Sequence, residues 1–330
     1  MNSLYNETEG RWSPEIAWWL SGYALQDIVD YMYKTGSRRY MSIARHTIEL
    51  QKEPLPWWPQ GGGYFRADST DDTGCKALAL IRMYDLTHDD QYLNISVLDE
   101  TYMYQYWTDD ECAGGLYQDI RNRAYKNAIS NELYILLAAS LYNRILPENT
   151  TYLTRAEAAW QWFNASGMIN ADSLVNDGLA ETADGVCFNN RGTTWTYNQG
   201  VILGALVELW RATGDDRYLS EARRIADAVV ITHNSTLTQD GILTEPCDGG
   251  ESLCNNDQQI FKGIFARYLA DLSNVVPGDP YREFLVRNAR SAFERARNET
   301  GFYDVSWKGP FRNATLGTQA SAASLFISLI

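Results

Sequence analysis

Apolar residues along the chain gather in six long stretches that have the spacing of helices. In several of these stretches most faces of the helix would be apolar, and a helix that is apolar all round is buried. Segments between them, such as Tyr218 to Val230, are amphipathic, with charged residues on one face. The pattern therefore predicts buried inner helices paired with amphipathic outer helices. The predicted inner helices are 15–34, 71–86, 127–145, 195–212, 256–274 and 317–330.

Two short motifs repeat along the chain and divide it into units of similar length. In one motif a turn precedes a tyrosine, at intervals of roughly 50 to 66 residues. Glycine would end one helix, a small polar residue would cap the next, and tyrosine would fill the corner. The tyrosines are Tyr40, Tyr92, Tyr152, Tyr218 and Tyr281. The second motif, a glycine before apolar or aromatic residues, occurs at Gly10, Gly63, Gly115, Gly178, Gly241 and Gly301.

These repeats imply six helix pairs. The expected fold is a closed, all-α (α/α)6 barrel that forms a single domain over residues 1–330, and an open solenoid is the alternative architecture. The chain starts near an inner helix and stops within one. We therefore expect one outer helix to be missing before Met1, and both ends of the chain to be truncated.

Composition and charge exclude two classes of protein. The hydrophobic share of 45% supports a large core and excludes wholesale disorder. The net charge of -14 repels phosphate backbones, so no nucleic-acid partner is predicted. The 11 Trp, 21 Tyr and 10 Phe residues fit either a tyrosine-rich core or a cleft lined with flat faces, as carbohydrate sites need.

Cysteine, histidine and asparagine usage bears on cofactors and compartment. The five cysteines match no zinc-binding spacing and the three histidines are scattered, so neither a metal nor another cofactor is predicted. Seven N-x-S/T sequons favour a secreted or cell-surface glycoprotein with disulfides, although no signal peptide opens the chain. No apolar run approaches the ~18 residues of a membrane span. The sequons lie at Asn6, Asn94, Asn149, Asn164, Asn234, Asn298 and Asn313.

The starts of the inner helices would share one rim of the barrel, and polar and aromatic residues gather there. Any one of these segments is ordinary as a helix cap. Their convergence predicts a concave site that binds hydroxyl groups and stacks on flat faces. The candidate substrate-binding residues are Trp18, Tyr125, Lys126, Asn127, Asn131, Trp195, Tyr197, Asn198, Gln199, Asn256, Asp257, Gln258 and Lys262.

Asp-Asp pairs occur four times, but only Asp71-Asp72 opens an inner helix at this rim. The pairs at 89–90 and 215–216 are expected to cap helices at the opposite rim, and the pair at 109–110 to lie in a solvated loop. One interpretation of Asp71 and Asp72 is a further cap that complements the helix dipole. The other is glycoside hydrolysis, which needs two carboxyls beside the scissile bond. Carboxyls on adjacent helical residues would lie about 5–6 Å apart, nearer the retaining than the inverting separation.

The second interpretation fits a known family. Over nearly its whole length the chain resembles glycoside hydrolase family 76, the α-1,6-mannanase family, in its fungal branch. The resemblance rests on segments 70–74 (TDDTG), 112–116 (CAGGL), 125–131 (YKNAISN), 195–200 (WTYNQG), 256–259 (NDQQ) and 261–263 (FKG).

The resemblance implies an (α/α)6 barrel and a retaining mechanism without a metal, with Asp71 as nucleophile and Asp72 as general acid/base. It also implies mannan or a mannoprotein glycan as the partner. Fungal relatives include cell-wall proteins thought to transfer mannoproteins onto wall polysaccharide, so transglycosylation is as compatible with the resemblance as hydrolysis. We further expect a monomer, with membrane anchoring through a tail beyond Ile330 as an option.

The chain departs from the family pattern just after the aspartates. The family usually carries aromatic residues where this chain has Cys75 and Lys76. Lys76 lies one helical turn after Asp72 and would favour its ionised form, whereas a general acid must hold its proton. We therefore expect reduced activity, unless Lys76 points to solvent and changes nothing.

Two other functions remain as alternatives. A disabled family member would bind mannan without cleaving it, as the residues Cys75-Lys76 suggest. A different (α/α)6 enzyme, an unsaturated-uronyl hydrolase, is disfavoured because the rim motifs carry no arginine cluster beyond Arg121 and Arg123.

Cysteine positions predict two disulfides. Cys247 and Cys254 flank a short loop that a bridge closes easily, and Cys112 and Cys187 both follow outer helices at the functional rim. Cys75 would be left free beside the proposed catalytic pair.

Overall fold

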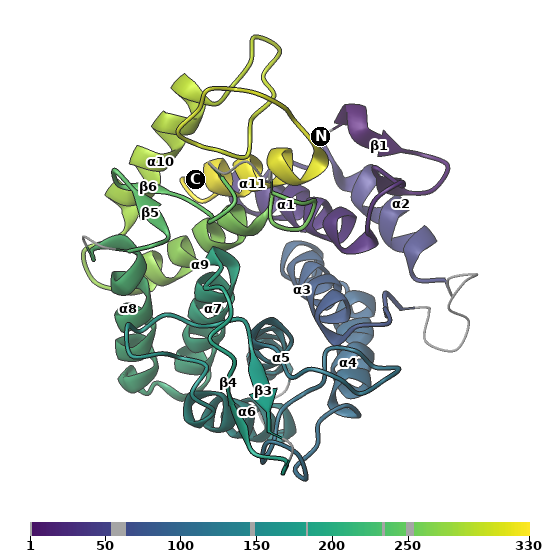
Figure 1. Ribbon diagram of the computed structural model, residues 1–330. Coiled ribbons are helices and arrows are strands. Elements are labelled where there is room, and N and C mark those ends of the chain that lie inside the picture. Colours follow the sequence, from purple (N-terminus) through teal and green to yellow (C-terminus); the bar gives the residue numbers. More distant parts are fainter. Residues whose placement is uncertain (1, 54–63, 146–148, 183, 233–234, 249–253) are drawn as a thin grey trace.

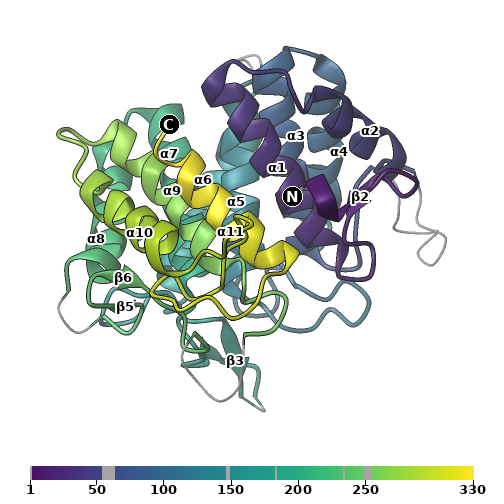
Figure 2. The same cartoon turned by 90° about the horizontal axis from the view of Figure 1, so that it is seen from above.

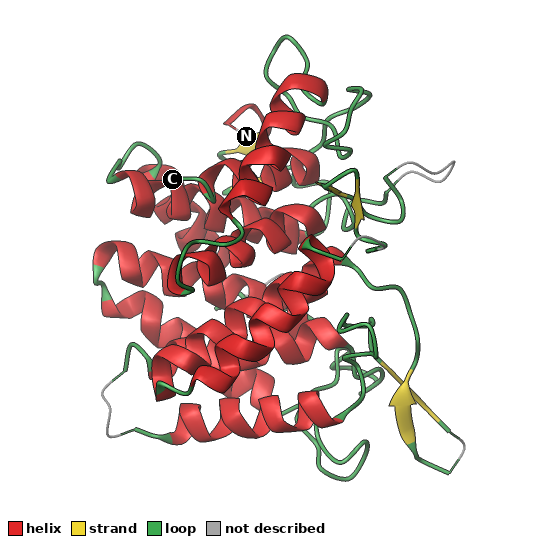
Figure 3. Cartoon of the chain, turned by 90° about the vertical axis from the view of Figure 1, so that its left-hand side faces the viewer, coloured by secondary structure: helices red, strands yellow, loops and turns green. Residues whose placement is uncertain are grey.

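The computed structural model of the chain describes residues 2–53, 64–145, 149–182, 184–232, 235–248 and 254–330. Helices make up nearly all of the regular structure, and the strands are short pieces within the connecting loops (Figure 3). The inner helices are α1 (Trp18–Thr35), α3 (Thr70–Thr87), α5 (Ala128–Tyr142), α7 (Thr196–Thr213), α9 (Phe261–Val275) and α11 (Leu316–Ile327). The outer helices are α2 (Met41–Gln51), α4 (Asp90–Tyr104), α6 (Thr151–Ala165), α8 (Asp216–Val230) and α10 (Arg282–Arg295).

The strands of the described chain form three antiparallel pairs, and a short 3-10 helix, η1 (Asn2–Leu4), precedes them. The pair that precedes α7 stands away from the helices (Figure 2). The pairs are β1 (Tyr5–Asn6) with β2 (Arg11–Trp12), β3 (Leu179–Glu181) with β4 (Cys187–Asn189), and β5 (Thr238–Gln239) with β6 (Ile242–Leu243).

The inner helices close into a ring. Each one contacts the next along the chain, and α11 contacts α1. Figure 1 shows this ring with the outer helices around it. The prediction of a closed (α/α)6 barrel is confirmed, and the open solenoid is wrong.

The predicted start of α9 differs most from the structure, by five residues, whereas the start of α1 and the ends of α5 and α11 differ by three. Helix α9 starts at Phe261 and not at 256, because residues 256–260 form turns. The side chain of Asn255 accepts a hydrogen bond from the Gln258 amide at 2.9 Å, and the side chain of Gln258 accepts one from the Asn255 amide at 3.0 Å. This reciprocal pair has the pattern of a capping box and closes the turn that leads into α9.

Close packing holds neighbouring inner helices together. Helix α5 is buried from Ala128 to Leu141, as its apolar pattern predicts. A Cβ atom at Gly200 in α7 would lie 2.6 Å from the Cα of Phe265 in α9. Since no side chain fits in so short a distance, the glycine allows the two backbones to touch.

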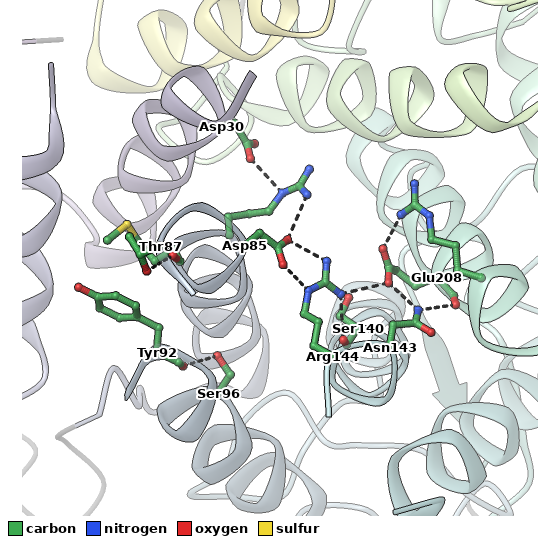
Figure 4. Close-up of polar contacts among 12 residues, drawn as sticks. Asp30, Asp85, Thr87, Tyr92, Ser96, Ser140, Asn143, Arg144 and Glu208 are labelled. Carbon is green, nitrogen blue, oxygen red and sulfur yellow. Dashed lines mark hydrogen bonds and ion pairs between the residues drawn. The ribbon is translucent and has the colours of Figure 1, made fainter. Parts of the chain in front are cut away.

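Ion pairs link the C-terminal ends of four inner helices (Figure 4). Asp30 of α1 pairs with Arg82 of α3 at 3.0 Å. Arg144, just after α5, pairs with Asp85 of α3 at 2.7 Å and with Glu208 of α7 at 3.3 Å. The Arg144–Asp85 pair is bidentate, with a second bond of 2.8 Å, and bidentate pairs are strong and directional.

The same network extends to the two remaining inner helices. Arg267 of α9 pairs with Asp27 at 2.6 Å and with Asp30 at 3.0 Å, both on α1. Ser324 of α11 donates a hydrogen bond to Asp27 at 2.6 Å. All six inner helices are therefore tied together at this end of the barrel, which we call the closed end.

Several predictions about loops are confirmed. Asp89 accepts a hydrogen bond from the Gln91 amide at 3.1 Å, and Asp215 accepts one from the Arg217 amide at 3.0 Å, so both cap outer helices. The structure contains the predicted disulfides Cys112–Cys187 and Cys247–Cys254, and Cys75 is free and buried.

The outer layer of helices has a gap on one side of the closed inner ring. Between α1 and α11 the described residues supply no outer helix, and a groove of about 620 Å³ lies there. Apolar side chains of both helices line it, among them Ile28, Tyr31 and Phe326. Across the described ranges, no helix combines the length and the apolarity that crossing a membrane requires.

We expect Arg144→Met to destabilise the protein by about 3 kcal/mol, because it leaves Asp85 and Glu208 without their shared cation in a largely buried place. Urea unfolding followed by circular dichroism measures this change. Arg217→Met is the matched control, since the Arg217 side chain is 91% exposed. An Arg144→Met protein as stable as the wild type would contradict a stabilising role for the closed-end network.

Candidate active site

The N-terminus of α3 carries Asp71 and Asp72, and local hydrogen bonds fix its position. Ser69 caps the helix by accepting a hydrogen bond from the Asp72 amide at 3.3 Å. The Thr70 amide donates to the carbonyl of Gln118 at 3.1 Å, and its hydroxyl donates to the carbonyl of Tyr117 at 2.8 Å. The loop after α4 therefore holds the start of α3, where the helix dipole favours negative charge.

Both aspartates line a cavity of about 200 Å³ at the end of the barrel opposite the closed end. Its walls come from the first halves of α1, α3, α5, α7 and α9 and are mainly aromatic and apolar, with a few polar groups, as is usual for small-molecule sites. The lining residues are Trp19, Tyr23, Gln26, Ser69, Asp71, Asp72, Cys75, Leu78, Gln118, Ile129, Leu133, Tyr197, Val201, Asp257, Phe261, Ile264 and Tyr268.

Hydrogen bonds orient the carboxylate of Asp71. Its Oδ2 accepts a bond from Nε2 of Gln118 at 3.0 Å, and its Oδ1 accepts one from the Asp72 amide at 3.0 Å. Each oxygen thus accepts one N–H hydrogen bond, and the two bonds fix the orientation of the Asp71 carboxyl at the cavity wall.

Asp72 has a different environment. Protein atoms surround its carboxyl densely although part of the side chain faces the cavity, and this desolvation raises the pKa to about 7. Lys76 lowers the pKa of Asp72, whereas the nearby charges of Asp71 and Asp257 raise it. Asp72 therefore retains its proton at mildly acidic pH and releases it near neutrality.

The position of Lys76 corrects one expectation. Lys76 is 1% exposed, so the alternative that it points to solvent is wrong. It acts against the protonated form of Asp72, as the sequence predicts, but burial outweighs it. Cys75 lines the cavity.

The opposite wall of the cavity combines aromatic faces with a carboxyl group. The indole Nε1 of Trp19 donates to Asp257 at 2.9 Å, which joins α1 to the turn before α9. The ring of Tyr197 stacks on Phe261, with centroids 3.9 Å apart and planes 11° apart. Large aromatic faces beside hydrogen-bonding groups suit a ligand with apolar faces and many hydroxyls.

Among the described residues one group of side chains has the spacing of a metal site, and it lies away from this cavity. It consists of Cys247, Asp248 and Cys254. The two sulfurs form a disulfide and are not thiolate ligands.

The sequence profile of glycosyl hydrolase family 76 matches residues 1–330. The chain belongs to this family. It is 28% identical over 309 residues to mannan endo-1,6-alpha-mannosidase DCW1 of Eremothecium gossypii, a match that covers 88% of this chain and 65% of the relative. It is 27% identical to mannan endo-1,6-alpha-mannosidase DFG5 of Candida albicans, over 99% of this chain and 75% of the relative. The chain thus spans less than two thirds of the first relative and three quarters of the second.

Solved structures of the family have the same fold. One is an inactive variant of an α-1,6-mannanase of Salegentibacter sp., with two consecutive aspartates replaced, in complex with α-1,6-mannotetrose. It is 25% identical to this chain, with a TM-score of 0.86 over 99% of this chain and 94% of that chain.

Few of the predicted binding residues of this family 76 chain reach the cavity. Besides Asp71 and Asp72, the lining includes only Tyr197 and Asp257 of the thirteen candidates. Trp195 does not line the cavity but packs edge-on against Phe261, which does, with centroids 5.7 Å apart.

Several other candidates hold the rim loops together. Lys126 is buried and donates to Oγ1 of Thr108 at 2.9 Å and to the carbonyl of Gly114 at 2.6 Å. Asn127 caps α5, and Asn131 accepts a hydrogen bond from the Leu116 amide at 2.8 Å. All three polar side chains therefore bind the protein's own backbone or a loop hydroxyl.

The candidates from the second half of the chain are placed in similar ways. Gln199 exchanges two hydrogen bonds with the backbone of Val175, at 2.7 and 2.9 Å. Lys262 is fully buried and forms an ion pair with Asp248. Gln258 closes the turn before α9, and Asn256 is exposed in that turn.

Three candidates lie around the cavity without lining it. Tyr125, at the rim, donates to Asp177 and accepts a hydrogen bond from Asn190 at 2.9 Å. Asn198 is buried, and its amide group has no hydrogen-bond partner in the described part of the chain. Trp18 is buried and stacks on Phe65, with centroids 6.3 Å apart.

Sequence reasoning missed most of the lining residues, including Trp19, Tyr23 and Gln118. Trp19 occupies the place expected for Trp18, because consecutive helical residues point about 100° apart. A signal for Trp19 was present: Tyr23 and Gln26 follow it at i+4 and i+7, the spacing of one helix face. Gln118 lies in a loop, and no periodic pattern selects it.

We expect the carboxyl of Asp72 to titrate with a midpoint near 7, because burial disfavours its ionised form. Carbon-detected NMR of the side-chain carboxyls from pH 3 to 9 would measure this titration, and Asp72→Asn would identify the resonance. Because the two aspartates interact, the measured titration curve reports on the pair and not on one carboxyl alone. If every carboxyl of the pair titrates below pH 5, the described environment of Asp72 is wrong.

Proposed function

We propose that this protein is a retaining glycosidase or transglycosidase that acts on α-1,6-linked mannan or on mannose-containing glycans of the fungal cell wall. The observation that carries the proposal is the contrast between two neighbouring carboxyls at one cavity. Asp71 is oriented by two N–H donors, whereas the pKa of Asp72 is raised to about 7. Pairs of carboxyls whose environments differ in this way divide nucleophile and acid/base roles between them.

In the proposed first step, Asp71 attacks the anomeric carbon of the bound sugar. Asp72 gives its proton to the glycosidic oxygen as the bond to the leaving sugar breaks. The products are a covalent glycosyl-enzyme on Asp71 and an ionised Asp72. In the second step Asp72 takes a proton from water or from a sugar hydroxyl as its oxygen attacks the anomeric carbon, and the bond between that carbon and Asp71 breaks, which restores both carboxyl groups. Water gives hydrolysis, and a sugar hydroxyl gives transglycosylation.

The relatives support the substrate class. Two of them carry the name mannan endo-1,6-alpha-mannosidase, and a solved relative is an α-1,6-mannanase in complex with α-1,6-mannotetrose. Its variant with two consecutive aspartates replaced is described as inactive, which is in keeping with catalytic roles for Asp71 and Asp72 here. The stacked rings of Tyr197 and Phe261 offer a face for a mannose unit.

A member that binds mannan without cleaving it is the second candidate function. It is favoured by Cys75 at the cavity, where the family usually carries an aromatic residue, and by Lys76, which lowers the pKa of Asp72. Against it, Asp72 still holds its proton up to about pH 7. A reduced rate with an intact mechanism therefore fits the site better than a complete loss.

Incubation with α-1,6-mannotetrose tests the proposal. We expect shorter or longer oligosaccharides to form with retention of anomeric configuration, as followed by chromatography and proton NMR. Asp71→Ala should abolish turnover, and Asp72→Asn should lower kcat by about 10² to 10⁴-fold because it removes the general acid. Binding without products would favour the second candidate. If mannotetrose is neither bound nor converted, the proposal is wrong.

Asp90→Asn is the matched control for these variants. Asp90 belongs to another Asp-Asp pair, at the start of outer helix α4, and is exposed there. Its loss should leave turnover unchanged. An equal drop in Asp90→Asn would indicate that the effects of the other two variants are structural.

We further propose that the protein is a secreted or cell-wall glycoprotein, that it acts as a monomer, and that mannoprotein glycan is its partner. Four of the sequon asparagines, Asn94, Asn149, Asn164 and Asn313, are exposed, which suits glycan attachment, whereas Asn234 lies outside the described residues. Endoglycosidase treatment of protein from a fungal secretory host should lower its mass by several glycans. An unchanged mass would contradict glycosylation.

A further inference from the structure

Lys76 is a buried cation for which the mechanism above has no use. It lies one helical turn after Asp72 on α3 and is 1% exposed. Its ammonium group has no hydrogen-bond partner and forms no ion pair among the described residues. A buried charge without a partner costs free energy, so its presence beside an acid/base residue calls for a physical account.

Helix α1 defines the place of the Lys76 side chain. A Cβ atom at Gly22 would lie 3.0 Å from Cγ of Lys76, so the lysine stem packs against the glycine. The ammonium group lies over the ring of Trp18, 5.6 Å from its centroid. An aromatic face attracts a cation, most strongly when both are out of water. The side chain is therefore held between α3 and α1, outside the lining of the cavity.

We propose that Lys76 is a positioning residue for proton transfer: its ammonium, held by Trp18 and Gly22, stabilises Asp72 after that carboxyl has released its proton. This inference rests on the proposed function. In the first step the proton of Asp72 moves to the glycosidic oxygen, the bond between that oxygen and the sugar breaks, and Asp72 becomes an anion. A cation one turn away lowers the free energy of that anion.

Among the charged groups that act on Asp72, Lys76 is opposed by three carboxyls. These are Asp71 beside it, Asp257 in the turn before α9, and Asp68 before α3, and all three favour the protonated form. Lys76 is the largest influence on Asp72 after desolvation. Without Lys76, burial and the three carboxyls would all raise the pKa of Asp72. A carboxyl that holds its proton more tightly is a weaker acid.

The other groups that face Lys76 oppose the effect of its burial. Burial lowers the pKa of the Lys76 ammonium, and Asp72, Asp99 of α4 and Asp68 act in the opposite direction. Asp99 is itself buried and pairs with Arg66 at 3.7 Å. Burial also raises the pKa of the Cys75 thiol well above its ordinary value, so this neighbour stays neutral.

The pH dependence of kcat/KM on α-1,6-mannotetrose tests the inference. In Lys76→Met, which keeps the length of the side chain but not its charge, the alkaline limb should move to higher pH by about one unit. The limb moves up because Asp72 then keeps its proton at higher pH. KM should not change, since Lys76 does not line the cavity. A limb that coincides with that of the wild type would overturn the inference.

Two variants separate charge from packing. Lys76→Arg keeps the charge and should keep the wild-type limb, whereas Lys76→Gln should shift it as Lys76→Met does and replaces that variant if it does not fold. Arg217→Met removes the same charge from an exposed position at the closed end and should leave the limb unchanged. A shift in Arg217→Met as large as in Lys76→Met would overturn the inference, because net charge would then explain it.

A titration without substrate distinguishes the inference from the proposed function. The NMR midpoint of Asp72 should rise in Lys76→Met relative to the wild type, whether or not the protein turns over mannotetrose. If the wild type shows no turnover but the midpoint rises, the proposed function fails and the electrostatic role of Lys76 stands. If turnover is present and the midpoint is unchanged, the role of Lys76 fails alone.

Discussion

The chain of ion pairs at the closed end is the constraint on which the rest of the barrel depends. Apolar packing between the inner helices is strong but non-directional, so by itself it leaves their axial positions weakly specified. The bidentate Arg144–Asp85 pair and the pairs of Arg267 with α1 have defined geometry. They set the register of the helices at one end, and the opposite ends can then diverge around a cavity without loss of the fold.

The two ends of the barrel treat negative charge in opposite ways. At the closed end Asp30, Asp85 and Glu208 each contact at least one arginine. At the cavity Asp72 faces several carboxyls and a single unpaired lysine. Desolvation, helped by these carboxyls, raises the pKa of Asp72 against the opposing charge of Lys76, whereas the carboxylates at the closed end are neutralised by arginines.

The fold could be predicted from the chain, but much of the site could not. Helical periodicity and the repeated turns reflect burial and capping, which are local in sequence, and they led to the barrel. The polar side chains at the helix starts were ambiguous, because a cap, a loop anchor and a sugar ligand need the same chemical groups. Lys126 and Asn131 proved to be loop anchors. Gln118 came to Asp71 from a distant loop, through tertiary contacts that no local pattern contains.

Both disulfides join segments outside the helices, and neither crosses the inner ring. Cys112–Cys187 ties the loop after α4 to strand β4. The Lys126 ammonium also donates hydrogen bonds to carbonyl groups of this loop. Reduction would therefore act on the rim and spare the helical ring, whose cohesion is apolar and ionic. The redox state of the compartment would then affect the shape of the cavity entrance more than the stability of the fold. Protein prepared under reducing conditions would be helical and compact and would unfold cooperatively, but its loops at the cavity entrance would differ from those of the oxidised protein.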